Sequence, residues 1–209
     1  MLALPPAAAL TASAVGGYLL GSIPFGVIAT RLGGAGDIRA VGSGNIEATN
    51  VLRTGRRDLA AMTLIGDAGK GAVAVLAAGW LVSPPAAVVA GGAAFLGHLF
   101  PVWLGFRGGK GLATAAGIVF AIAWPVGIAA ALTWLAMAAV FRLSSLAALT
   151  TAVLAPLYLL VLDRGSGEPR LWLMVGMAVL IFIRHHQNIR RLLDRTEPRI
   201  GAGKAAPPP

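Results

Sequence analysis

The most informative absences from this 209-residue sequence are those of charge and of cysteine. Charged residues make up only 12% of the chain, 57% of the residues are hydrophobic, and the mean hydropathy is +0.79. A soluble domain carries about twice that charged fraction, so the composition predicts an integral membrane protein. The lack of cysteine excludes disulfide bonds and thiol chemistry. Uncharged segments of roughly twenty residues recur, and this length favours membrane-spanning helices over a barrel.

Basic residues are missing from the first 30 positions, and the earliest is Arg31. Because a cleavable signal peptide begins with a basic region, the first apolar stretch is expected to be retained as a span. The net charge of +9 would also suit a nucleic-acid-binding protein. Lysines and arginines on cytoplasmic loops of a membrane protein give the same excess, so we expect membrane lipids and no nucleic acid as partners.

The number of spans depends on the run from Leu112 to Phe141, which contains no charge. As one helix it would be about 45 Å long, too long for one span and too short for two full ones. If Trp124-Pro125 forms a turn, fourteen lysines and arginines lie on one side of the membrane, Arg164 and Arg170 lie on the other, and one lysine lies at the membrane edge. An undivided run gives nine and seven. The positive-inside rule favours the first arrangement.

The sequence therefore predicts an all-α polytopic membrane protein with seven transmembrane helices, its N-terminus outside and its C-terminus in the cytoplasm. Residues 1–200 are expected to form a single domain, and the proline-rich residues 201–209 a disordered tail. The first span covers about residues 7–30. Pro24 lacks a backbone donor, and glycines flank it at positions 21 and 26, so this end of the span is expected to be kinked or broken.

A polar stretch at residues 42–53, Gly-Ser-Gly-Asn-Ile-Glu-Ala-Thr-Asn-Val-Leu-Arg, interrupts the apolar sequence. Glycines on both sides of Ser43 let the backbone turn so that several N–H groups point at one anion. From Asn45 onward the pattern suits a helix that places Thr49 and Arg53 one turn apart on one face. This geometry favours a negatively charged ligand at a helix N-terminus. The alternative is a polar loop without a ligand.

A second glycine-rich loop, Gly108-Gly109-Lys110-Gly111, has the character of a phosphate cradle followed by a helix. It is not a P-loop, because Leu104 stands at the position of the first Walker glycine and Gly111 where Ser or Thr would hold magnesium. A flexible basic loop that contacts anionic lipid is the alternative. Asp67 and Lys70 form either a simple ion pair or part of the same site, and His98 either packs at a helix end or joins them.

Several kinds of chemistry are disfavoured by what the sequence omits. It has no pair of inward carboxylates and no cluster with metal-ligand spacing, so we expect neither a metal nor another cofactor. The soluble-type acyltransferase signature, a histidine followed five residues later by aspartate, is also missing. A transporter of phosphate or organophosphate anions built from broken helices is the alternative function. Against it stand the lack of an internal repeat and the predicted placement of all polar clusters at one membrane face.

Taken in order, residues 21–26, 42–53, 67–71, 97–111 and 184–189 resemble the bacterial acyl-phosphate-dependent glycerol-3-phosphate acyltransferase family. The resemblance covers nearly the whole chain. It implies a seven-helix inner-membrane enzyme with its site at the cytoplasmic side. Such an enzyme moves a fatty acyl group from acyl phosphate to the 1-hydroxyl of glycerol 3-phosphate, giving lysophosphatidic acid and phosphate. It uses neither acyl-CoA nor acyl carrier protein.

The same resemblance implies roles for individual residues. The residues expected to act in catalysis are Ser43, Asn45, Thr49, His185 and Asn188. Those expected to bind substrate are Asn50, Arg53, Asp67, Lys70, His98, Gly108, Gly109, Lys110, Gly111 and Ser145.

Two residues depart from the family pattern. Glu47 stands where the family has glycine, and Gln187 where it has an acidic residue. We expect Glu47 either to pair with Arg53 or Arg56 or to weaken phosphate binding by charge repulsion, and we favour repulsion over a role as proton acceptor. The proton acceptor for the glycerol hydroxyl is left open between Asp67, Glu47, His185 and a substrate phosphate.

Overall fold

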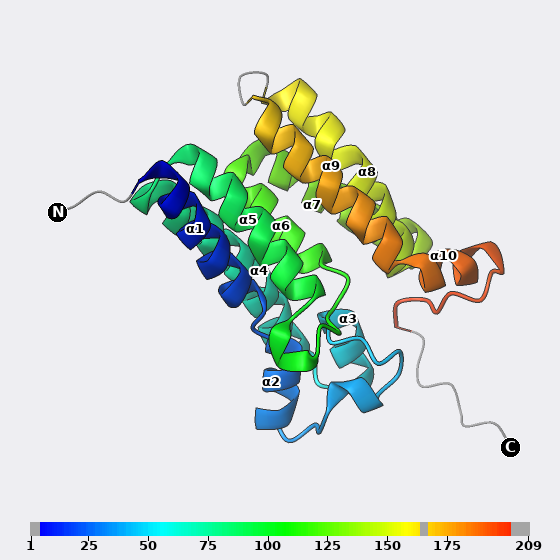
Figure 1. The fold of residues 1–209 in the computed structure, drawn as a ribbon. Helices are drawn as coiled ribbons and strands as arrows, with labels where there is room; N and C mark the ends of the chain where they lie inside the picture. Colours follow the sequence, from blue (N-terminus) through cyan, green and yellow to red (C-terminus); the bar gives the residue numbers. More distant parts are fainter. Residues whose placement is uncertain (1–4, 164–166, 202–209) are drawn as a thin grey trace, which may run out of the picture.

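Helices supply all of the regular secondary structure in residues 5–163 and 167–201, which are the residues that this computed structural model describes (Figure 1). The all-α prediction is confirmed for this part of the chain. The α-helices in chain order are α1 (Pro6–Gly21), α2 (Phe25–Leu32), α3 (Ala48–Val51), α4 (Arg57–Leu81), α5 (Pro84–Leu99), α6 (Leu112–Ile122), α7 (Trp124–Phe141), α8 (Ser144–Leu162), α9 (Glu168–Arg184) and α10 (His186–Leu193). Short 3₁₀ turns cover Ile38–Ala40, Leu52–Thr54 and Val102–Leu104. The predicted tail falls outside the described residues from position 202 onward.

Both breaks that the sequence predicted are present. Pro24, with φ −90° and ψ 76°, separates α1 from α2. Ala123, with φ −152° and ψ 78°, separates α6 from α7. Pro125 then lies in the first turn of α7, where a missing backbone donor costs nothing because the helix has no acceptor for it there.

Within residues 5–163 and 167–201, five helical stretches are long and apolar enough to cross a membrane. They are Pro6–Leu32, Arg57–Leu81, Pro84–Leu104, Trp124–Phe141 and Ser144–Leu162. Helix α6 has 11 residues and α9 has 17, so both are shorter than each of these five stretches. The prediction of an integral membrane protein agrees with these long apolar helices, and the count of seven spans remains a proposal.

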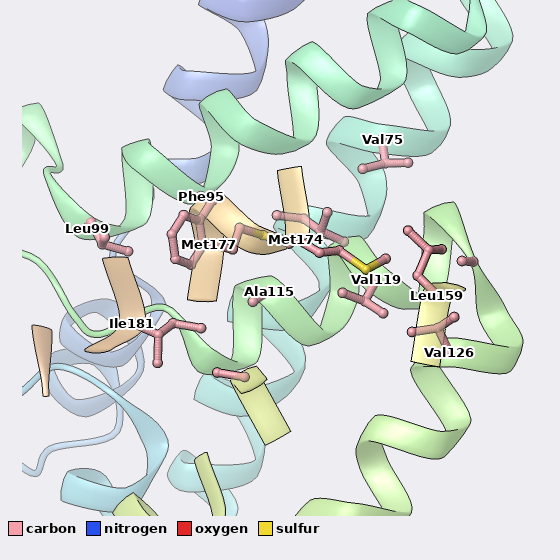
Figure 2. Packing of buried hydrophobic residues seen from close by; sticks show 13 residues of the cluster. Val75, Phe95, Leu99, Ala115, Val119, Val126, Leu159, Met174, Met177 and Ile181 are labelled. Atoms are coloured by element: carbon pink, nitrogen blue, oxygen red, sulfur yellow. The ribbon is translucent and has the colours of Figure 1, made fainter. Parts of the chain in front are cut away.

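Small residues let the helices of the bundle approach closely. A Cβ atom at Gly21 would collide with the backbone of Ala94 in α5, and one at Gly117 in α6 would collide with the backbone of Ala68 in α4. Glycine and alanine at such contacts are typical of membrane helices, which gain packing rather than a hydrophobic driving force when they associate. Larger side chains fill the space between α5, α6 and α9, where Figure 2 shows Phe95 beside Met177.

The irregular segments gather at one end of the bundle (Figure 1). Helices α2, α3 and α10 and the loop between α5 and α6 all lie there. The end of α8 and the start of α9 lie at the opposite end. Polar residues from segments far apart in the sequence are therefore close together at a single end of the molecule.

Candidate active site

Hydrogen bonds to its backbone fix the conformation of the loop of residues 108–111. The amides of Gly108 and Gly109 donate to the carbonyls of Leu99 (3.1 Å) and His98 (3.2 Å). Arg184 donates from Nη2 to the carbonyl of Gly108 (2.7 Å) and from Nε to that of Gly109 (3.0 Å). With these groups occupied, the next two amides, those of Lys110 and Gly111, are free to meet an acceptor.

That acceptor is Glu47. Its Oε1 atom accepts from the amides of Lys110 (2.8 Å) and Gly111 (2.7 Å) and lies 3.3 Å from Nε2 of His98. Its Oε2 atom accepts from Nδ2 of Asn45 (2.9 Å). The two amides, the His98 ring and the Asn45 amide are together called the amide cradle below.

Of the alternatives that the sequence left open for Glu47, pairing with Arg53 or Arg56 is therefore wrong. Arg56 pairs with Asp58 instead, at 2.6 Å, and no hydrogen bond joins Glu47 to Arg53 within the described residues. The physical reason is the number of donors. The amide cradle offers several to one carboxylate at a site where only 13% of the Glu47 side chain is exposed, whereas either arginine would hold it in solvent.

Behind the cradle lies a buried chain of ionisable groups. Nδ1 of His98 is 3.5 Å from Oδ1 of Asp67, which pairs with Nζ of Lys70 at 2.9 Å. Lys70 also donates to the carbonyl of Ile23 (2.9 Å), which lies at the break between α1 and α2. The side chains of Asp67 and Lys70 are each 1% exposed. The structure thus joins all three predicted residues, and it places them as a support for Glu47.

A second polar cluster lies on the other side of Lys110. Its Nζ atom donates to Oδ1 of Asn188, whose Nδ2 donates to Oε1 of Glu197 (2.6 Å). Arg191 donates from Nε to Oε2 of Glu197 at 2.7 Å. Ser145 is buried beside Glu197. Lys110, Asn188 and Ser145, which the sequence assigned to one pocket, therefore lie together.

Lys110 and Glu197 in this second cluster have shifted pKa values. Burial lowers the pKa of Lys110, although the carboxylates of Glu47 and Glu197 oppose that shift. Burial favours the neutral form of Glu197, but hydrogen bonds from Asn188 and Arg191 outweigh it and hold the pKa of that carboxyl below its usual range. Lys110 thus lies between two anionic side chains of the protein itself.

His185 follows α9 and is buried. Its Nδ1 atom lies 2.7 Å from the carbonyl of Ile181, so Nδ1 carries the proton and donates it. Burial lowers the pKa of His185, and the nearby charge of Lys110 lowers it further. The ring is therefore neutral at neutral pH, with the lone pair of Nε2 free to accept a proton.

The loop of residues 42–53 is organised by Asn50. Its Oδ1 accepts from the amide (3.2 Å) and the hydroxyl (3.3 Å) of Ser43, and its Nδ2 donates to the carbonyls of Ile38, Val41 and Asn45. The prediction of a helix from Asn45 onward is wrong at its start, because α3 begins at Ala48. Glu47 adopts an extended backbone with φ −85° and ψ 162°, which lets its side chain reach the cradle.

Thr49 and Arg53 are exposed at the edge of this loop. Arg53 lines a cavity of about 400 Å³ together with Val41, Thr54 and Arg56, and no hydrogen bond joins it to Lys110. The two predicted anion loops are therefore connected through Glu47, and Arg53 lies to one side of that connection.

The sequence did not assign a role to three residues that build the site. Arg184 fixes the loop at residues 108 and 109, and Glu197 and Arg191 complete the cluster around Asn188. Arg184 stands at the end of an apolar run, and it entered the sequence analysis through the charge count and the family resemblance, without a role of its own. Glu197 gives no sequence signal, because its contact depends on the chain reversing after α10.

Long apolar helices with an amide cradle, a partly buried lysine and a buried histidine at one end define a class: an integral membrane protein with a polar, partly buried site at one end of its helix bundle. Comparison with known proteins narrows this class. The sequence profile of the glycerol-3-phosphate acyltransferase family matches residues 11–195. This chain therefore belongs to the glycerol-3-phosphate acyltransferase family.

Relatives and solved structures agree with this assignment. A glycerol-3-phosphate acyltransferase of Caulobacter vibrioides is 66% identical over 194 residues, which cover 92% of this chain and 88% of the relative. A crystal structure of PlsY (YgiH), an integral membrane glycerol 3-phosphate acyltransferase in its glycerol 3-phosphate form, superposes with a TM-score of 0.86 at 38% identity and covers 92% of this chain and 96% of that one. The lysophosphatidic acid form of PlsY gives 0.84 at 36% identity and covers 92% and 95%.

Proposed function

We propose that this protein transfers a fatty acyl group from acyl phosphate to the 1-hydroxyl of glycerol 3-phosphate. The products are lysophosphatidic acid and phosphate, in the first step of phospholipid synthesis. The observation that carries the proposal is the convergence of Lys110, Asn188 and the amide cradle at one end of a membrane helix bundle in a member of this family. Because the chain belongs to an acyltransferase family, we no longer propose the alternative function of an anion transporter.

The chemistry asks little of the protein beyond charge and alignment. Acyl phosphate is an activated mixed anhydride, so the reaction needs neither acyl-CoA nor acyl carrier protein, and no covalent intermediate on the enzyme. The site must neutralise two anions, hold the hydroxyl about 3 Å from the acyl carbon, and stabilise the departing phosphate. Lys110, Arg53 and the backbone amides of the two loops supply positive charge and donors for these tasks.

His185 is the protein group that we assign to accept the proton of the glycerol hydroxyl, with a substrate phosphate as the alternative acceptor. Glu47 is already occupied by several donors, and Asp67 is paired with Lys70 inside the bundle. His185 is neutral and keeps Nε2 free. Ser43, Asn45, Thr49, Asn188 and Ser145 then orient the two substrates.

We place the site at the cytoplasmic side of the bacterial inner membrane, with seven spans, the N-terminus outside and the C-terminus in the cytoplasm. The charge distribution supports this topology, and so does the gathering of α2, α3, α10 and the loop after α5 at one end (Figure 1). Helices α6 and α9 would be the two shorter spans, and membrane lipids would surround the bundle.

The decisive assay incubates the purified protein with acyl phosphate and glycerol 3-phosphate and measures lysophosphatidic acid. We expect product with acyl phosphate and none when acyl-CoA or acyl carrier protein carries the same acyl chain. Product from acyl-CoA alone would overturn the assignment of the donor. Absence of product from all three donors, with folded protein, would overturn the proposed reaction.

A further inference from the structure

The Glu47 carboxylate lies where the geometry suits an oxygen of a phosphate group. Two consecutive backbone amides, those of Lys110 and Gly111, converge on Oε1 with His98 Nε2 nearby. Consecutive amides that meet at one oxygen form a typical site for phosphate or carboxylate anions. The loop leaves no room for a side chain at position 109, because a Cβ atom at Gly109 would collide with His98. The cradle is therefore built for an anion, and an anion from the chain occupies it.

This carboxylate is charged at physiological pH. Burial favours its protonated form, but the hydrogen bond and charge of His98 and the charge of Lys110 outweigh burial and hold the pKa of Glu47 below its usual range. A carboxylate with such a low proton affinity and with its lone pairs already engaged is a poor general base. The arrangement therefore argues against Glu47 as the proton acceptor.

Nothing in the backbone requires glutamate at this position. The φ and ψ angles of Glu47, −85° and 162°, are open to any residue. The side chain spans from the loop of residues 42–53 to the loop of residues 108–111, 63 positions further along the chain. The Glu47 side chain thus brings a negative charge to the cradle. Two anions cannot accept from the amides of Lys110 and Gly111 at the same time.

We propose that Glu47 is a resident anion, which fills the amide cradle in the substrate-free protein and is displaced by the phosphate group of a substrate. The inference rests on the proposed function, since it takes a phosphate group as the displacing ligand. That group belongs either to glycerol 3-phosphate or to acyl phosphate. Glu47 thereby sets the affinity for that substrate, because binding must first break the contacts of the carboxylate.

The test measures dissociation constants of inorganic phosphate and of glycerol 3-phosphate by calorimetry, using the full chain in detergent. Glu47→Gln keeps the shape of the side chain and removes its charge, so we expect phosphate to bind about tenfold more tightly. Glu47→Asp keeps the charge but shortens the reach by one methylene. If the carboxylate occupies the cradle, this variant should also bind phosphate more tightly than the parent. Simple charge repulsion predicts no change in its phosphate affinity.

Asp58→Asn is the matched control. It removes one negative charge from an exposed residue that pairs with Arg56, away from the cradle, and we expect its dissociation constants to equal those of the parent. Tighter binding of glycerol 3-phosphate but not of a non-hydrolysable acyl phosphonate to Glu47→Gln would identify glycerol 3-phosphate as the displacing substrate. The reverse result would identify the acyl donor.

A measurement on the parent protein removes dependence on folding of the variants. With ¹³C-labelled glutamate, adding inorganic phosphate is expected to shift a carboxylate infrared band that Glu47→Gln lacks. Weaker phosphate binding by both Glu47 variants would overturn the inference, and so would an unshifted band at saturating phosphate. Either result would mean that Glu47 permanently connects the two loops. Failure of parent and variants alike to bind phosphate would also overturn it.

These outcomes are separable from the proposed reaction. If lysophosphatidic acid forms normally but the affinity ratio between parent and Glu47→Gln is one, the resident-anion inference fails alone. If the affinity ratio is as expected but no acyl transfer occurs, the proposed reaction fails and displacement of the carboxylate stands.

Discussion

At the scale of single residues, Lys110 is the group that joins the two halves of the site. Its backbone amide contacts Glu47 and its ammonium contacts Asn188, so one residue connects the amide cradle to the cluster around Glu197. Lys110 is half-buried, and this burial lowers its pKa. A charge in such a position interacts strongly with a phosphate that enters beside it.

Replacing Lys110 with alanine is therefore expected to cost about 2–4 kcal/mol of transition-state stabilisation, a fall in kcat/KM of roughly 30- to 1,000-fold. Steady-state rates of lysophosphatidic acid formation measure this. Arg107→Ala is the control, because Arg107 is an exposed cation three positions earlier in the same loop. Equal effects of the two substitutions would show that only the general positive charge of the loop matters.

His185 gives the reaction its expected dependence on pH. Because its pKa is lowered by burial and by Lys110, the imidazole stays neutral through neutral pH. It takes up a proton only below the ordinary histidine range, which is near 6.5. If neutral His185 accepts the substrate proton, kcat/KM should fall on the acid side as pH drops through that lowered pKa. The His185→Gln variant should be slow and lack this acidic limb. An unchanged acidic limb in the variant would assign the proton to a substrate phosphate.

At the scale of elements, close helix contacts hold the site-bearing segments in place. Gly117 of α6 lies against the backbone of Ala68 in α4, one residue from Asp67. Alanine at position 117 would collide with that backbone, so the two helices must separate. We expect Gly117→Ala to destabilise the protein by about 1–3 kcal/mol, the usual range for overpacking.

Thermal unfolding in detergent measures this effect against a matched helix glycine. Beyond the adjacent backbone of its own helix, no heavy atom of the described residues lies within 4 Å of where a Cβ at Gly69 of α4 would be, so Gly69→Ala should leave the unfolding temperature unchanged or raise it. A lower unfolding temperature for Gly69→Ala than for Gly117→Ala would contradict the packing described for α4 and α6.

The same scale shows what the sequence could and could not predict. The break at Pro24 was predictable because proline disrupts the helix in which it lies. The break at Ala123 was predictable because the membrane thickness limits the length of a spanning helix. The start of α3 at Ala48 was missed, since it depends on Glu47 reaching a loop 63 positions away. The contact of Glu197 with Asn188 likewise arises from a chain reversal that no local pattern records.

At the scale of the whole molecule, orientation in the membrane follows from charge. Of the seventeen lysines and arginines, the predicted topology places fourteen on the cytoplasmic side. Each cationic side chain near the surface is attracted to the anionic lipids of the cytoplasmic leaflet by about 1 kcal/mol. An asymmetry of this size favours one orientation, in which the site-bearing loops would face the cytoplasm.

Reporter fusions test this orientation directly. Fusions after Ser83 and at Gly167 are expected to report the outside, and a fusion after Gly201 the cytoplasm. The two outer fusion points lie at the turns α4–α5 and α8–α9, and the third lies beyond α10 near the site. A control removes part of the positive charge that sets the orientation. Replacing Arg190, Arg191 and Arg195 with glutamine should reduce the fraction of the C-terminal reporter that stays in the cytoplasm, without affecting the reporter after Ser83. If the fusion after Gly201 reports the outside in the parent chain, the seven-span topology is wrong. The cluster formed by Asn188 and Glu197 would then lie outside, and the charge count would no longer support a cytoplasmic site.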